Sequence, residues 1–213
     1  MQSDLEIRNS KSESRNKEFQ VRELTEPDWK FNREMYFKVG DQWKWIDKRP
    51  WSDEQWREYA ENPSLRTFAA YSDAKLIGYY ELRRTVALPP RSHRSQVTSQ
   101  TKENLTGHTL HVTCHLQDEI EIAYFGLLPE FIGRGFGGAL LASAIQNAWG
   151  WAPTPSRVWV HTCNRDHPSA LANYLARGFT IYKVELLSER CRARSRTGKC
   201  GRSRLIIRFK FRK

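Results

Sequence analysis

The feature that most constrains the fold is an alternation of strand and helix patterns in the second half of the chain. Residues Glu119–Leu127 read EIEIAYFGL, which is typical of a strand, and Phe136–Gly150 repeat apolar side chains every three or four positions, as an amphipathic helix does. A second strand at 157–163, a second helix at 167–178 and a third strand at 179–186 follow. Strands separated by helices need crossover connections, so the sequence predicts an α/β fold with a partly parallel sheet.

The first half of the chain predicts further strands and two helices. Residues 19–24 alternate apolar and polar side chains, as a first strand should. A helical pattern covers 28–40, and Ser52 with Gln55 forms a capping-box pattern for a second helix. Two short β-like runs around a turn within 66–82 predict a hairpin.

The segments outside this pattern divide the chain. Residues 1–18 are polar, so we expect a disordered leader and no secretory signal, and we predict a cytoplasmic protein. The body of the chain, 19–189, is predicted to be one domain, interrupted at 85–118 by a long polar insertion loop. No apolar run approaches the roughly 18 residues of a membrane helix, so no membrane contact is expected.

The formal net charge of +11 is confined to the C-terminal end. Residues 190–213 hold eleven of the 35 basic residues and none of the 24 acidic ones, so the rest of the chain is neutral. We interpret this segment as a basic C-terminal tail in which 204–211 alternates well enough to be a last strand. Such a block is either a solvated tail or a weak contact with nucleic acid or another polyanion through Arg190–Lys213.

The sequence IGRGFGG at 132–138 joins a strand to a helix. Closely spaced glycines let backbone N–H groups converge at the start of a helix, which binds phosphate through partial charges, and Arg134 adds a formal charge. A dinucleotide fingerprint is excluded by the glycine spacing and by the lack of a following acidic residue, and a Walker A loop by Ala139. A tight turn that binds nothing would also explain the cluster.

A family resemblance favours the phosphate-binding interpretation. The stretch EIAYFGLLPEFIGRGFGGALL resembles the acetyl-CoA-binding core of the GNAT superfamily of N-acetyltransferases, whose Gln/Arg-x-x-Gly-x-Gly/Ala pattern is filled by 132–137, with Ile132 at the place of the usual Gln or Arg. ANYLARGF at 172–179 resembles the family's closing helix and strand, and VWVHTC followed by DHP at 166–168 resembles a bacterial subset. The resemblance implies the GNAT fold, an α/β fold with a mixed, strongly twisted sheet of six or seven strands flanked by helices.

The resemblance also implies the chemistry. The implied reaction is the transfer of an acyl group, expected to be acetyl, from acetyl-CoA to a primary amine. The amine attacks directly in a ternary complex, CoA is the product, and no metal is required. The sequence does not specify the acceptor amine, and the protein is expected to be a monomer or homodimer. The cofactor-binding residues implied are Gly126, Leu127, Leu128, Ile132, Gly133, Arg134, Gly135, Phe136, Gly137, Gly138, Asn164 and Tyr174.

Tyr174 is the implied proton donor to the departing thiolate. A phenol, whose ordinary pKa is about 10, suits a thiolate of similar basicity. The alternative is a core residue at helical spacing with Leu171 and Leu175.

Glu121 resembles the general base of the histone-acetylating branch of the family, and Glu81 on the hairpin is the second candidate. A carboxylate in an apolar strand is costly to bury unpaired, which argues for a role. However, Glu119 and Glu121 alternate with isoleucines, so both fit a solvated face equally well.

Aromatic and metal-ligating residues give two weaker signals. Four tryptophans within QWKWIDKRPWSDEQW fit either an aromatic box for the acceptor or the packing of two helices. A zinc site is not predicted, because the candidate ligands lack a second pair at finger spacing; they are His108, His111, Cys114 and His115. Two rival functions stay open: an acyl-CoA-binding module without turnover, and an RNA- or ribosome-associated protein that uses the basic tail.

Overall fold

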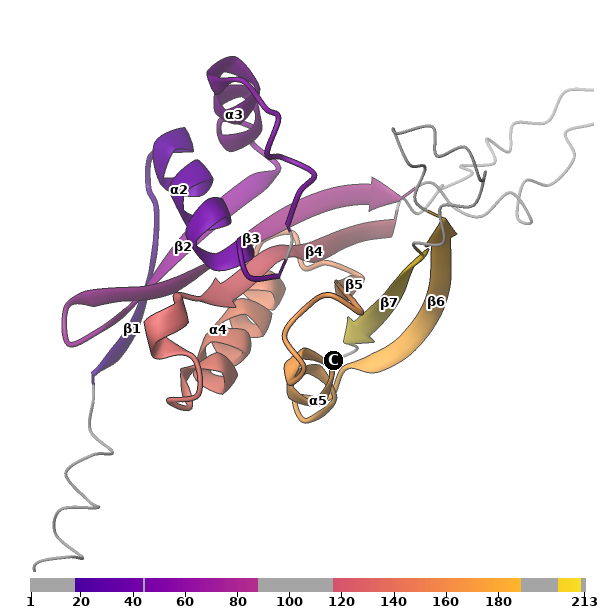
Figure 1. Ribbon diagram of the computed structural model, residues 1–213. Helices are drawn as coiled ribbons and strands as arrows, with labels where there is room; N and C mark the ends of the chain where they lie inside the picture. Colours follow the sequence, from indigo (N-terminus) through magenta and orange to yellow (C-terminus); the bar gives the residue numbers. More distant parts are fainter. Residues whose placement is uncertain (1–17, 44, 88–116, 189–202, 212–213) are drawn as a thin grey trace, which may run out of the picture.

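The computed structural model describes residues 18–43, 45–87, 117–188 and 203–211. Their strands form one seven-stranded sheet in the order β1-β2-β3-β4-β5-β7-β6, with helices on both faces (Figure 1). In chain order the elements are β1 (Phe19–Glu23), α2 (Trp29–Gly40), α3 (Asp53–Ala60), β2 (Leu65–Ser72), β3 (Lys75–Ala87), β4 (Gln117–Leu127), a 3₁₀ turn η2 (Pro129–Phe131), α4 (Phe136–Gly150), β5 (Arg157–Cys163), α5 (Ala170–Leu175), β6 (Thr180–Ser188) and β7 (Ser203–Phe211). The predicted α/β class is confirmed.

The two N-terminal helices begin where their capping residues predict. The Asp28 carboxylate accepts a hydrogen bond from the backbone N–H of Phe31 at the start of α2. Ser52 and Gln55 make both hydrogen bonds of the capping box at the start of α3. Helix α5 is shorter than predicted, because it covers only 170–175 of the expected 167–178.

The structure corrects the limits of the predicted insertion loop. Strand β3 continues to Ala87, and β4 begins at Gln117, which pairs with it. The ends of the segment predicted to be loop, 85–87 and 117–118, are therefore strand. Residues 88–116, and residues 1–17 of the predicted leader, lie outside the described residues.

The last predicted strand is confirmed, but it is not part of a tail. Strand β7 lies between β5 and β6 and pairs antiparallel with both. Phe209, two residues before its end, is fully buried in the main core. The domain therefore extends past the predicted limit at 189 to include β7. Residues 189–202, which hold six of the eleven basic residues of 190–213, lie outside the described part.

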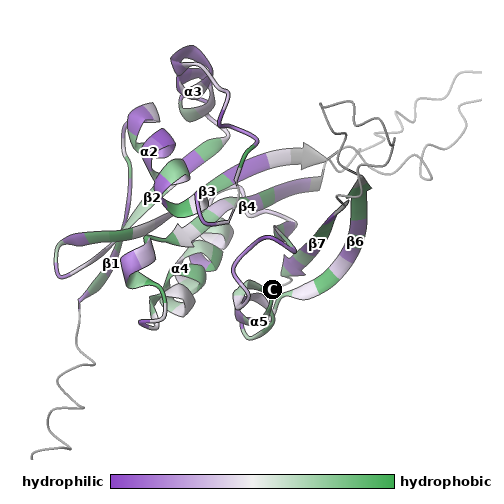
Figure 2. Ribbon diagram, in the orientation of Figure 1, coloured by the Kyte–Doolittle hydropathy of each residue, from purple (hydrophilic) through white to green (hydrophobic). Residues whose placement is uncertain are grey.

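Side chains alternate between the two faces of the sheet. On one face, Ile120 and Ile122 of β4 pack with Leu140 and Ala144 of α4 in the main core. On the other face, α2 covers β3 and β4 through a smaller cluster that includes Met35. Figure 2 shows α4 largely white to green and α3 largely purple, as their positions over core and solvent require. None of the helices in the described ranges combines the length and apolar character needed to cross a membrane.

Among the described strands, only β4 and β5 pair in parallel, and their ladder is short. It joins Glu119–Ile122 to Arg157–Val160 and then ends. Strand β7 pairs with Val158–Cys163 along the other edge of β5, and none of the described strands pairs with Ala123–Leu127 of β4 on the side that faces β5. The two strands therefore diverge in the middle of the sheet.

Candidate active site

A cavity of about 860 Å³ lies where β4 and β5 diverge. It reaches from the turn before α4, on one face of the sheet, to the α2–α3 connection on the other. The predicted cofactor-binding residues that line it are Gly126, Leu127, Ile132, Gly133, Gly135, Gly137, Gly138 and Tyr174.

The glycine turn before α4 needs its glycines for two reasons. Gly133 and Gly135 have φ values of 79° and 87°, in the left-handed region that other residues avoid. A Cβ at either position would meet no atom within 4 Å, so the turn is open on its outer side. Its N–H groups at the start of a fifteen-residue helix can therefore donate hydrogen bonds to a phosphate, and the residues present fit the phosphates of acetyl-CoA.

Glycines 137 and 138 lie against α5. The carbonyl of Gly137 accepts from Asn173 Nδ2 at 3.4 Å, and that of Gly138 accepts from Arg177 Nε at 2.8 Å. A Cβ on Gly138 would overlap the Arg177 guanidinium, whereas one on Gly137 would make only ordinary contacts of 3.9 Å. These bonds join α4 to α5 beside the cavity.

Four predicted cofactor residues lie elsewhere. Leu128, Arg134 and Phe136 are not among the cavity-lining residues, although they flank those that are. The Asn164 side chain accepts a hydrogen bond from the backbone N–H of Leu205 at 3.3 Å and is likewise absent from the wall.

Glu121 is buried on the cavity wall, so it does not lie on a solvated face. Only 2% of the residue is exposed. One oxygen accepts two hydrogen bonds from the Arg83 guanidinium, and the other lies 3.2 Å from His161 Nδ1. Burial alone would raise the pKa of Glu121, but the His161 hydrogen bond and the Arg83 charge outweigh it and lower that pKa below its usual range.

His161 is a site residue that the sequence reasoning missed. It lies on β5, lines the cavity, and its side chain is 41% exposed. The signal was its alternation with Trp159, which pairs with Glu121 and so shares its face. That signal becomes readable only once the register of β5 against β4 is known.

Glu119, the other carboxylate of the predicted solvated face, is also buried. It forms an ion pair with Arg157 on β5 and does not line the cavity. Glu81, the second candidate base, is 1% exposed and likewise absent from the wall. Its oxygens accept from Asn32 Nδ2 at 2.8 Å and from the Tyr59 hydroxyl at 2.5 Å, and burial raises its pKa.

Tyr174 lines the cavity from α5 and is 6% exposed. Its ring packs against Phe209 and Phe179, with centroids 5.4 and 5.9 Å away, whereas Leu171 and Leu175 are exposed. Tyr174 is therefore part of the core, but its core partners are not the two leucines that its helical spacing suggested. Burial, with a contribution from the Asp166 charge, raises the pKa of Tyr174 well above that of a free phenol, so the expected match to a thiolate is poorer than the sequence suggested.

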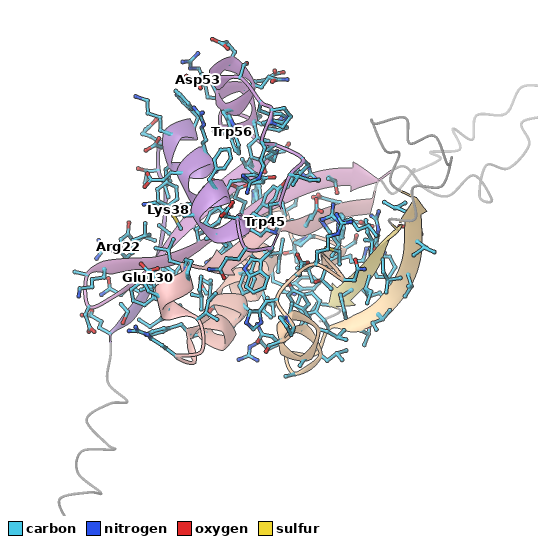
Figure 3. The ribbon with its side chains drawn as sticks, in the orientation of Figure 1. Arg22, Lys38, Trp45, Asp53, Trp56 and Glu130 are labelled. Atoms are coloured by element: carbon cyan, nitrogen blue, oxygen red, sulfur yellow. The ribbon has the colours of Figure 1, made fainter. Side chains whose placement is uncertain are left out.

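The aromatic side chains proposed as a box for the acceptor are packed against one another and against Lys48. Trp45 lies beside the end of α2 with its ring centroid 5.0 Å from that of Tyr124, and Trp56 of α3 is buried (Figure 3). The ammonium of Lys48 lies 3.5 Å from the Trp51 ring centroid and 3.3 Å from that of Tyr59. The tryptophans therefore pack, as one alternative predicted, and the cation on their rings is Lys48 of the protein and not an acceptor.

Comparison with known proteins agrees with this architecture. Residues 20–179, well over half of the chain, match the Acetyltransferase (GNAT) family. The chain belongs to this family. None of the curated proteins matches the sequence.

Solved structures share the GNAT fold at low identity. Arabidopsis thaliana NAA60 in complex with acetyl-CoA has a TM-score of 0.59 at 13% identity, covering 91% of this chain and 98% of that one. A Bacillus subtilis acetyltransferase in complex with CoA has a TM-score of 0.55 at 18% identity, covering 92% and 99%. The ribosomal-protein-S18-alanine N-acetyltransferase of Escherichia coli has a TM-score of 0.53 at 13% identity, covering 91% and 93%. At these identities the likeness concerns the fold alone.

Across the described ranges, no group of His, Cys, Asp and Glu is arranged to hold a metal ion. The four residues weighed as zinc ligands in the sequence lie outside those ranges.

Proposed function

We propose that this GNAT protein transfers an acetyl group from acetyl-CoA to a primary amine within one ternary complex, without a metal. The observation that carries the proposal is the divergence of β4 and β5. It leaves the edge of Ala123–Leu127 free inside the cavity, between the glycine turn on the α4 face and the Glu121–His161 pair on the other face.

The N–H groups of 133–138 would hold the phosphates of acetyl-CoA, and the free edge of β4 would hold its arm. When bound, acetyl-CoA supplies an acetyl group activated as a thioester. The backbone N–H groups on that edge would also stabilise negative charge that develops on a carbonyl oxygen.

The base that we propose is His161, held in place by Glu121. With its proton on Nδ1, the imidazole donates to Glu121 and leaves Nε2 free to accept a proton from the attacking amine. Arg83 fixes the carboxylate and lowers its basicity, which makes Glu121 itself a weak base. Tyr174 remains the proposed proton donor on the opposite face of the sheet.

An acceptor screen tests the proposal. The protein is incubated with acetyl-CoA and a panel of small amines, peptides and protein lysines, released thiol is measured, and hits are confirmed by product mass. Thiol release that requires an amine and yields the acetylated amine is expected. CoA binding by calorimetry without thiol release from any amine would instead indicate a binding module that lacks turnover.

A further inference from the structure

The charged side chains that line the cavity differ in how far they are already paired. All three carboxylates of the wall accept hydrogen bonds from within the protein. Asp47 accepts from the hydroxyls of Tyr36 and Tyr124 at 2.8 and 2.5 Å. Glu121 is held as described, and Asp166 accepts from a hydroxyl and a backbone N–H at the end of β5 at 2.6 and 2.9 Å. Each negative charge of the wall therefore already accepts hydrogen bonds from the protein.

Two cationic side chains of the same wall, Lys48 and Arg204, form no ion pair with a described carboxylate. Among the described residues, no carboxylate lies within ion-pair distance of Lys48 or Arg204, although both line the cavity. Lys48 is only 5% exposed and contacts aromatic faces. Arg204 contacts Cys163, and its Nε is buried without a hydrogen-bond partner.

Both cations lie on the face opposite to the glycine turn. Arg208 pairs with His161 across β5 and β7, and Arg204, four residues earlier on the strand, shares its face. Lys48 contacts Tyr59, whose hydroxyl bonds to Glu81 beneath α2. The proposed site for the cofactor's phosphates lies on the α4 face, so these two cations are placed to bind a different ligand.

We infer that the acceptor amine carries an oxyanion, either a carboxylate or a phosphate, which Lys48 and Arg204 bind while the amine lies at the Glu121–His161 pair. This inference rests on the proposed function, because it names the substrate class of that same site. It excludes simple polyamines as preferred acceptors, since the box that could hold their charge is occupied by Lys48.

The energetics favour an anion at this place. Lys48 is buried against aromatic rings without a counter-ion, which is unfavourable, and a bound oxyanion would provide that counter-ion. Burial, with a smaller contribution from the charge of Arg83, lowers the pKa of Lys48 to about 8. The negative charges of Glu81, Asp47 and Glu121 oppose this shift. An oxyanion beside the ammonium would raise the pKa again, so its binding near pH 8 should take up protons, which calorimetry in buffers of different ionisation enthalpy detects.

Matched acceptor pairs test the inference. We would compare 4-(aminomethyl)benzoate with benzylamine, and O-phosphoethanolamine with ethanolamine, so that each pair differs in the oxyanion and the two pairs separate carboxylate from phosphate. The member with the oxyanion should have a KM lower by about 10- to 100-fold in at least one pair. Lys48→Met and, independently, Arg204→Met should abolish that difference, whereas the exposed controls Lys75→Met and Arg22→Met should keep it.

Two results would overturn the inference: equal KM values within both pairs for the native protein, or loss of CoA affinity in Arg204→Met, which would assign that cation to the cofactor. If no amine is acetylated, the proposed function fails, and calorimetry on the CoA-bound protein then decides the inference alone. Tighter binding of the oxyanion member supports it, and equal binding refutes it.

Discussion

Replacing Glu121 with Gln separates the structural and catalytic roles of the buried carboxylate. The substitution keeps the shape of the side chain but removes the charge that Arg83 neutralises and that orients His161. It should therefore reduce both the free energy of unfolding and the rate of acetylation, for different reasons.

The loss of stability can be estimated from the geometry. Breaking a buried ion pair by removing one partner typically costs about 3–5 kcal/mol, and a hydrogen bond to a charged group contributes about 1.5–3 kcal/mol. Because the Arg83 side chain is 47% exposed, water can solvate it again, and Gln still offers an acceptor oxygen. We therefore expect Glu121→Gln to lose about 2–3 kcal/mol at pH 7, which lowers Tm by about 4–12 °C.

The loss should depend on pH in a defined direction. The pKa of Glu121 is lower in the folded protein than its ordinary value of 4.5, so its contribution to stability is complete above that value. The contribution is lost as the pH falls through the lowered pKa. Urea unfolding of both proteins should show the full difference at pH 7 and a shrinking difference below about pH 4.

Glu119→Gln is the matched control, because Glu119 is also buried on β4 and paired with an arginine, yet lies outside the cavity. It should lose comparable stability and keep its kcat, whereas Glu121→Gln should lose about 10²–10⁴-fold in kcat. A folded Glu121→Gln protein with nearly native kcat, or an equal loss of kcat in Glu119→Gln, would refute the reasoning.

Three single substitutions test the proposed cofactor turn, proton donor and base separately. Gly137→Val should keep α4, because its Cβ makes only 3.9 Å contacts, yet weaken CoA binding by calorimetry at least about tenfold; native affinity would place the site elsewhere. Tyr174→Phe keeps the packing against Phe209 and should lower kcat about tenfold or more with CoA affinity unchanged, whereas full kcat would leave the tyrosine a core residue. His161→Ala should lower kcat about 10²–10⁴-fold, and added imidazole should partly restore it; a rate that imidazole cannot raise argues against His161 as base.

The sequence predicted what is decided locally. Asp28, Ser52 and Gln55 specify helix starts through hydrogen bonds that span three residues, so no distant part of the chain is needed to place them. The strands of the hairpin and the glycine turn before α4 follow from periodicity and from backbone conformation in the same way.

What the sequence could not supply is pairing between distant segments. The basic segment gave no sign that β7 would lie between β5 and β6, because that position depends on two strand pairings. Glu121 fitted a solvated face until Arg83 and His161 were known to pair with it. His161 gained a role only from the register that places β5 beside β4.

The divergence of β4 from β5 is itself an argument for a ligand with amide groups. A bulge leaves Ala123 without a partner on β3, directly after the parallel ladder ends at Ile122. From there to Leu127 the edge of β4 that faces β5 lines a cavity inside the molecule, where backbone N–H and C=O groups rarely stay without partners. A strand-like ligand that continues the ladder would satisfy them, and the arm of CoA carries amides that can do so. The bulge and the end of the ladder thus leave an edge of β4 to which the arm of a cofactor could bind as an added strand would.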